Sequence, residues 1–140
     1  MGFIQATVRA TPRGDTGRFI AVRVTPAVRA GVTAFAGVVL QEAKAMVPVR
    51  TGELRDSGKV VVEESEKSVR AHVVFDAPHA AYVEFGTGRA GSESAGAGPY
   101  TYTMSWPGMP ARPYLRPALD TAREAGMALF RGSVSAEFRF

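Results

Sequence analysis

Few residues in this chain are of the types that carry out chemistry, and none stands in a recognised spacing. The grouping richest in metal-ligating side chains is Asp76, His79 and Glu84, with His72 shortly before it. This spacing matches no standard zinc, calcium or metalloprotease signature. His72 falls on the polar face of an expected strand, and His79 follows Pro78 in a turn, where a surface hydrogen bond explains it. We therefore expect no metal, no cofactor and no catalytic residue.

A serine nucleophile and a phosphate-binding loop are not indicated either. The sequence contains no Gly-x-Ser-x-Gly. The serines considered as nucleophiles fall in polar turns or in a glycine-rich stretch, namely Ser57, Ser65, Ser68, Ser92 and Ser94. That stretch begins Gly86-Thr87-Gly88-Arg89-Ala90-Gly91, which lacks the Gly-Lys-Ser/Thr ending of a P-loop. A linker between two anchored elements explains the same composition. These patterns indicate that the protein is not an enzyme.

Nucleic-acid binding is the stronger alternative from a different class. Five arginines flank predicted turns and three aromatic residues are available to stack on bases, namely Arg50, Arg55, Arg89, Arg112 and Arg116 with Tyr100, Tyr102 and Trp106. No known nucleic-acid-binding module accompanies them. Arginine is equally favoured at protein interfaces, where its planar guanidinium pairs with carboxylates.

Composition limits the kind of fold that could position these residues. With 140 residues, of which 46% are hydrophobic, the chain is long enough for one core, so we expect a single domain over 1–140. There is no cysteine, which excludes disulfides and thiolate metal sites. The net charge of +4 is modest. No membrane span or signal peptide is predicted, so we expect the protein to be made and kept in the cytosol unless something larger carries it out.

Hydrophobic periodicity predicts the elements of the first half. Two alternating runs around a Pro- and Gly-rich turn predict a hairpin over residues 1–25. Apolar residues at spacings of three and four then predict a long helix from Pro26 that ends before Pro48. Two strands follow at 59–63 and 69–75, and in the second Val69, Ala71, Val73 and Phe75 would share one face.

The second half is less regular. Residues 81–85 suit either a strand or a helical turn, and 86–110 is expected to be a flexible loop. A second helix is predicted from Leu115 to Leu129, followed by an alternating strand over 133–140. The predicted fold class is α+β, with an antiparallel sheet of about four to six strands packed against the long helix and the C-terminal helix.

Three stretches resemble a family of small neck or tail-completion proteins of long-tailed bacteriophages. The first is Ala45-Met46-Val47-Pro48-Val49-Arg50-Thr51-Gly52-Glu53-Leu54-Arg55-Asp56-Ser57; the second is His79-Ala80-Ala81-Tyr82-Val83-Glu84-Phe85-Gly86-Thr87-Gly88; the third is Pro110-Ala111-Arg112-Pro113-Tyr114-Leu115-Arg116-Pro117-Ala118-Leu119. Their order and spacing extend the resemblance over roughly residues 26–131.

The resemblance implies a structural subunit of the virion neck, assembled as a ring around the channel through which DNA leaves the head. The expected partners are copies of itself, as a hexamer or dodecamer, and adjoining head-completion, terminator or tail-tube proteins. DNA would pass through the lumen without sequence recognition, and no membrane partner is expected. A tail terminator ring that caps the tail tube is the alternative within phage structure.

Residue types suggest which side chains would contact neighbouring subunits. In the second stretch, Tyr82 and Phe85 are expected to anchor the strand end, while Glu84 faces an arginine, which a neighbouring subunit can supply. A terminal strand ending in Phe138 and Phe140 would expose apolar side chains unless it pairs within its own sheet or with the next subunit. The predicted interface residues are Arg50, Arg55, Tyr82, Glu84, Phe85, Arg112, Tyr114, Arg116, Phe138 and Phe140.

Overall fold

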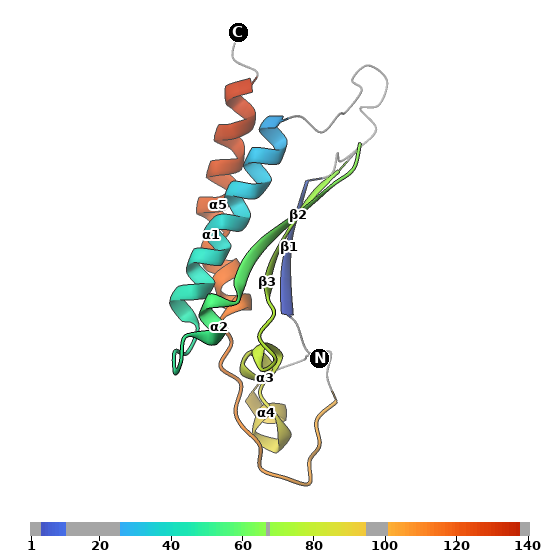
Figure 1. The fold of residues 1–140 in the computed structure, drawn as a ribbon, viewed down its shortest axis with the longest axis vertical. Helices are drawn as coiled ribbons and strands as arrows, with labels where there is room; N and C mark the ends of the chain where they lie inside the picture. Colours follow the sequence, from blue (N-terminus) through green and yellow to red (C-terminus); the bar gives the residue numbers. More distant parts are fainter. Residues whose placement is uncertain (1–3, 11–25, 67, 95–100, 138–140) are drawn as a thin grey trace.

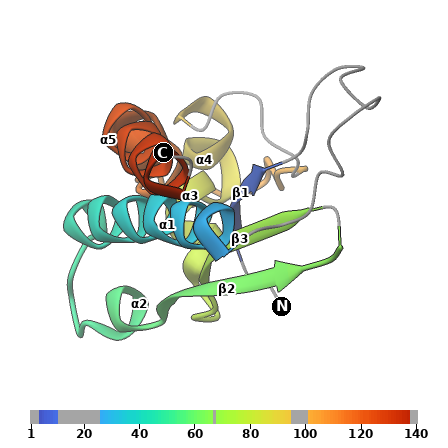
Figure 2. The ribbon, with the colours of Figure 1, turned by 90° about the horizontal axis from the view of Figure 1, so that it is seen from above.

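The computed structural model describes residues 4–10, 26–66, 68–94 and 101–137, which form an α+β domain of two layers. A small antiparallel sheet makes one layer, and two long helices that run side by side make the other (Figures 1 and 2). In chain order the elements are β1 (Ile4–Ala10), α1 (Pro26–Met46), α2 (Glu53–Asp56), β2 (Gly58–Glu64), β3 (Val69–Phe75), α3 (Ala80–Phe85), α4 (Gly88–Ser94) and α5 (Leu115–Glu137).

The sheet is smaller than the sequence suggests. Within the described residues it has three antiparallel strands in the order β1-β3-β2, so the expectation of four to six strands is wrong for this part of the chain. The predicted strands at 59–63 and 69–75 are confirmed, and they pair as a hairpin with Gly58 opposite Phe75 and Glu64 opposite Val69. The returning strand of the predicted N-terminal hairpin lies outside the described residues.

The central strand β3 carries the sheet's share of the core. Its alternate residues Val69, Ala71, Val73 and Phe75 are all fully buried, as the alternation predicts. Helix α1 lies over this face with Val32, Ala36, Val39 and Ala43 inward, at the spacing that places them on one side of a helix. The long helix from Pro26 is therefore confirmed.

Helices α1 and α5 pack closely because each places a glycine against an aromatic ring of the other. A Cβ atom built on Gly126 of α5 would lie 2.7 Å from the ring of Phe35, and one on Gly31 of α1 would lie 2.8 Å from Phe130. Both distances are shorter than real Cβ contacts, so only glycine fits at either position. These two contacts fix the antiparallel register of the pair (Figure 1).

The predicted C-terminal strand is wrong as far as the described residues reach, because α5 continues to Glu137. Every fourth residue of α5 from Ala118 to Phe130 is on the side that faces α1, and Val134 continues this spacing. The helical period therefore persists here, although so short a run also fits the alternation of a strand. Phe138 and Phe140 lie outside the described residues.

In its described parts, residues 86–94 and 101–110, the segment predicted to be a flexible loop over 86–110 is partly helical and is packed. Residues Gly88–Ser94 form α4, and Thr87 pairs with Met109, with the Thr87 nitrogen donating to the Met109 carbonyl at 2.8 Å and the Met109 nitrogen donating back at 3.0 Å. Gly108 occupies the left-handed region, and a Cβ there would overlap the Thr87 carbonyl. None of the helices in the described ranges is long and apolar enough to cross a membrane.

Candidate assembly surface

The second and third sequence stretches meet at the start of α5, where the Glu84 carboxylate binds the helix terminus. Glu84 is fully buried. Its Oε2 accepts from the backbone nitrogens of Tyr114 at 2.7 Å and Leu115 at 2.9 Å, and its Oε1 accepts from that of Arg116 at 3.1 Å. These groups have no partner within a helix, and the positive end of the helix dipole also favours a carboxylate there. Glu84 therefore acts as the cap of α5, supplied by α3.

An arginine completes this cluster, and it belongs to the same chain. The Arg116 guanidinium Nε donates to Glu84 Oε1 at 3.1 Å, and the guanidinium carbon lies 4.8 Å from the centre of the Phe85 ring. Glu84 was expected to face an arginine, which a neighbouring subunit could supply, and the arginine that it faces in this structure is Arg116 of the same chain. Because Glu84 and Tyr114 are fully buried and Phe85 nearly so, these three support the surface from within the subunit and do not form it.

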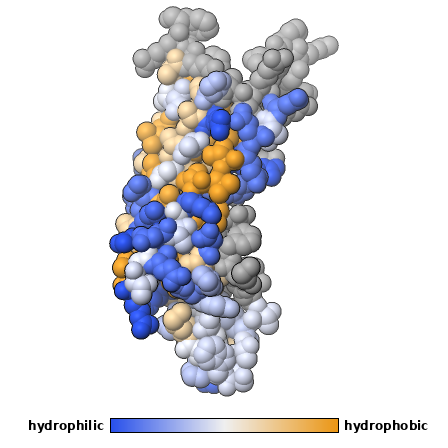
Figure 3. All heavy atoms as spheres, viewed as in Figure 1, coloured by the Kyte–Doolittle hydropathy of each residue, from blue (hydrophilic) through white to orange (hydrophobic). Residues whose placement is uncertain are grey.

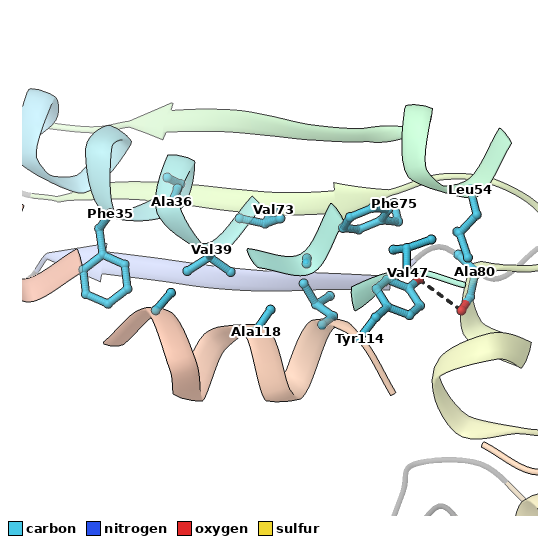
Figure 4. Packing of buried hydrophobic residues seen from close by; sticks show 14 of the residues in the cluster. Phe35, Ala36, Val39, Val47, Leu54, Val73, Phe75, Ala80, Tyr114 and Ala118 are labelled. Carbon is cyan, nitrogen blue, oxygen red and sulfur yellow. Dashed lines mark hydrogen bonds between the residues drawn. The ribbon is translucent and has the colours of Figure 1, made fainter. Parts of the chain in front are cut away.

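Tyr114 links the start of α5 to the hydrophobic core (Figure 4). Its ring meets that of Phe75 edge-on, with centroids 5.0 Å apart, and its hydroxyl donates to the Ala80 carbonyl at 3.2 Å. Burial, with a smaller contribution from the Glu84 charge, raises the pKa of the Tyr114 phenol above its ordinary value of 10. On the other side of α3, the Tyr102 hydroxyl donates to the Phe85 carbonyl at 2.8 Å. Helix α3 is therefore fixed to both α5 and the 101–109 segment.

The first stretch forms a corner that reaches the same end of the molecule. Helix α1 ends before Pro48, Gly52 takes the left-handed conformation with φ of 86°, and Leu54 returns to the core beside Val47 (Figure 4). Arg55 stays exposed and pairs with Asp56, as expected for the polar side of this corner. The chain therefore turns between α1 and α2 and returns to the core at Leu54.

Between this corner and α3 lies an open groove of about 740 Å³. Its apolar lining includes three side chains that remain exposed although they are large: Tyr82 at 58%, Trp106 at 49% and Met109 at 38%. Arg50 and His79 also line it. Tyrosine, tryptophan, methionine and arginine are the residues enriched in protein interfaces. We name this feature the Tyr82–Trp106 groove.

Tyr82 and Met109 depart from the sequence-based expectation in opposite ways. Tyr82 was expected to anchor the strand end, but it is exposed, because α3 turns its neighbours Ala81 and Phe85 inward instead. Met109 was not identified from the sequence, and Trp106 was considered only for base stacking. The signal that was available is that Trp106 and Met109 each stand directly before a proline, Pro107 and Pro110, where a stiff backbone presents side chains outward.

The grouping of possible metal ligands is not brought together. Asp76 pairs with Lys59 at 2.8 Å, which lowers the pKa of its carboxyl through that hydrogen bond and the lysine charge. His72 lies 3.3 Å from Glu63, His79 lines the groove, and Glu84 caps α5. Across the described ranges no three histidine, cysteine or acidic side chains are grouped so that they could hold a metal ion.

Comparison with protein families gives one match. Residues 8–86, more than half of the 140-residue chain, match the family described as "Bacteriophage HK97-gp10, putative tail-component". The chain belongs to this family. The matched range contains β2, β3, the corner and α3, including Glu84 and Tyr82, while Trp106 and the start of α5 lie beyond it.

Membership in the HK97-gp10-like family indicates a structural role in the tail or neck of a phage particle, which places the protein in the virion and agrees with the resemblance of the three stretches. A non-enzymatic role is consistent with this family. Searches of curated proteins and of solved structures gave no match.

Proposed function

We propose that the chain is a structural subunit of the phage neck, and that copies of it form a ring at the head-to-tail junction around the DNA channel. The observation that carries the proposal is the Tyr82–Trp106 groove, an exposed aromatic surface on a tail-component subunit. Large apolar side chains gathered on a surface mark sites where other proteins bind. The groove is therefore the first candidate for contact with a neighbouring subunit or an adjoining neck protein.

The backbone segments that carry the groove's side chains are held in place by contacts with the rest of the domain. Helix α3 beneath Tyr82 is held by Glu84 at the start of α5, and the 101–109 segment is held by the Thr87–Met109 pairing and by Tyr102. A surface fixed in this way loses little conformational entropy when it is buried, which favours affinity. The groove's volume also suits a small ligand. Among the described residues, however, no three histidine, cysteine or acidic side chains are grouped so that they could hold a metal ion there.

One arginine lines the groove, and two more belong to segments whose backbone nitrogens bond to residues next to it. Arg50 lines it, the Arg89 nitrogen donates to the Trp106 carbonyl at 3.1 Å, and the Arg112 nitrogen donates to the Val83 carbonyl at 2.7 Å. All three side chains are exposed, and in the described part of the chain none makes an ion pair. Of the predicted interface residues, Arg50, Arg55, Tyr82, Arg112 and Arg116 are exposed, and all ten, Phe138 and Phe140 included, stay predictions as interface residues.

The test is complementation of a phage from which the gene has been deleted. Loss of the protein should give filled heads and tails of normal length that do not join, as seen by electron microscopy. Tails of uncontrolled length would instead identify the terminator ring. Absence of the protein from finished particles would exclude the neck role.

The groove is tested in the same phage with the double variant Tyr82→Ala and Trp106→Ala. It should fold, yet reproduce the unjoined heads and tails. Leu129→Ala is the matched control, because Leu129 lies on α5 and its exposure of 46% is close to that of Trp106. A double variant that joins heads to tails normally would show that the groove is not the contact.

A further inference from the structure

A second, smaller pocket adjoins the Tyr82–Trp106 groove. It lies between α3, the start of α4 and residues 101–106, and its volume is about 230 Å³. Four aromatic side chains line it, namely Tyr82, Phe85, Tyr102 and Trp106. Tyr82 and Trp106 also line the groove, so a molecule bound in the groove lies directly beside this pocket. We name it the aromatic pocket.

The walls of the aromatic pocket are fixed by hydrogen bonds between the segments that form it. The Tyr102 hydroxyl donates to the Phe85 carbonyl at 2.8 Å, which joins the 101–106 segment to α3. The Arg89 nitrogen donates to the Trp106 carbonyl at 3.1 Å, which joins the same segment to α4. The pocket is therefore formed before anything binds, and a preformed pocket loses little conformational entropy when it is filled.

The volume of the aromatic pocket suits one side chain. An apolar cavity of about 150 Å³ holds a benzene molecule. Pockets that take whole small molecules are usually larger, at about 300–1,000 Å³. At about 230 Å³ the aromatic pocket lies between the two, which fits a single large side chain of a protein bound in the adjoining groove.

The charges in and around the pocket exclude a cationic side chain. Aromatic rings attract cations, but none of the described residues that line this pocket is charged, so a buried cation would have no carboxylate partner. The Arg116 guanidinium already lies over the Phe85 ring at 4.8 Å and would repel a second cation. Figure 3 shows this end of the molecule, which carries α3 and α4, mostly in pale shades near the middle of the hydropathy scale.

An aromatic side chain matches this lining best. Aromatic rings that meet edge-on or with an offset gain about 0.5–1.5 kcal/mol beyond the burial of their area. In the described part of the chain only Tyr82 and Trp106 are both aromatic and exposed, and they are walls of the pocket itself. The described surface of a second copy therefore offers no other exposed aromatic side chain to fill it.

We infer that the aromatic pocket receives one uncharged aromatic side chain of an adjoining virion protein that binds in the Tyr82–Trp106 groove. Large aromatic anchors buried in a pocket contribute most of the binding energy of many protein interfaces. The inference rests on the proposed function and names the chemistry by which the partner is recognised.

The first experiment measures the preference of the pocket in the purified protein. Trp106 is the single tryptophan of the chain, so its indole N–H gives one signal in a nitrogen–proton correlation spectrum. N-acetylphenylalaninamide should shift this signal saturably. N-acetylargininamide should bind at least about tenfold more weakly, because its charge would be buried without a partner. Equal or tighter binding of the arginine derivative would overturn the inference.

A filled pocket provides the matched control. Thr101→Phe places a ring at the rim, because Thr101 is exposed and lines the pocket, whereas Thr121→Phe makes the same change at an exposed position on α5. The first variant should weaken the binding of N-acetylphenylalaninamide at least about tenfold, and the second should leave it unchanged. Unchanged binding in Thr101→Phe would show that the probe binds elsewhere, which contradicts the inference.

The second experiment identifies the donor in phage particles. The photoreactive residue p-benzoylphenylalanine replaces Thr103, which is exposed and lines the pocket, and the linked segment is sequenced after irradiation. The expected link is to an adjoining virion protein beside an aromatic residue, and alanine in place of that residue should remove the link. A link to another copy of this chain, a partner segment without an aromatic residue, or no link at all would overturn the inference. Absence of the protein from particles defeats the proposed neck function instead, and the binding measured in solution is independent of it.

Discussion

At the scale of single residues, Glu84 shows how a charge can be buried without a large cost. Its two oxygens accept four hydrogen bonds, three from backbone nitrogens at the start of α5 and one from Arg116. Buried carboxylates are retained where such donors satisfy them. The sequence showed a glutamate between aromatic residues, but a partner 30 residues away cannot be read from local periodicity.

Substitution of Glu84 by glutamine should destabilise the fold strongly, because an amide cannot accept from all four donors and places its own N–H groups against them. We expect a loss of about 2–4 kcal/mol in the free energy of unfolding, measured by urea titration. Arg116→Ala should cost no more than about 1 kcal/mol, since its side chain is 44% exposed. Equal losses in the two variants would mean that the ion pair, and not the helix cap, is the principal interaction.

Tyr114 should make the protein sensitive to alkali. Its raised pKa means that above about pH 10 the phenol ionises in the unfolded chain while it stays protonated in the folded one. Unfolding then releases a proton, so stability that is complete below pH 10 is lost as the pH rises further. The fall in unfolding free energy between about pH 8 and about pH 11 should be smaller for Tyr114→Phe than for the wild type. An identical fall in both proteins would contradict this assignment.

At the scale of elements, the regular segments follow from sequence and the exceptions have physical reasons. The apolar spacing of α1 and the alternation of β3 determined both elements, because each buries one face against a large partner. Residues 133–137 were misassigned because Val134 and Ala136 fit both periods over so short a run. Helix α4 was missed because the glycines that depress helix propensity, Gly88 and Gly91, are buried against the 101–109 segment.

The candidate site was predictable in its parts but not in its assembly. Arg50, Tyr82 and Arg112 were identified from residue type and flanking turns, and they are exposed. Their arrangement depends on the Thr87–Met109 pairing and on the cap of α5, which are contacts between distant segments. Only tertiary packing decides such contacts, so the groove itself could not be read from the chain.

Two glycines of α5 provide a matched test of its packing against α1. Gly126→Ala should destabilise the protein by about 1–3 kcal/mol, because the methyl group meets the Phe35 ring at 2.7 Å. Gly132→Ala should stabilise it by up to about 1 kcal/mol, since nothing lies within 4 Å of its Cβ and alanine favours helix. Thermal unfolding of both variants gives the comparison. A stable Gly126→Ala protein would show that the two helices can move apart cheaply.

At the scale of the whole molecule, the domain presents two surfaces on different elements. The Tyr82–Trp106 groove lies between the corner after α1 and α3. A second groove, lined by Ala30, Thr33 and Val62 among others, lies between α1 and β2. A subunit with two distinct contact surfaces suits an assembly in which it touches both copies of itself and other proteins.

Removal of the groove's aromatic side chains should separate association from folding. Since Tyr82 and Trp106 are about half exposed, the purified Tyr82→Ala, Trp106→Ala protein should change its unfolding free energy by less than about 1 kcal/mol. Its association, followed by sedimentation over a range of concentrations, should weaken relative to the wild type if copies meet at this groove. A wild-type protein and variant that sediment identically as oligomers would assign the groove to another neck protein.

The paired contacts of Gly31 with Phe130 and Gly126 with Phe35 have a mechanical consequence. Each ring occupies a notch in the opposite helix, so a displacement of one turn would drive an aromatic side chain into backbone. The helical layer therefore resists shear. In the proposed ring, any widening of the central passage would therefore come from whole subunits pivoting about their shared boundaries, with the interior of each subunit unchanged.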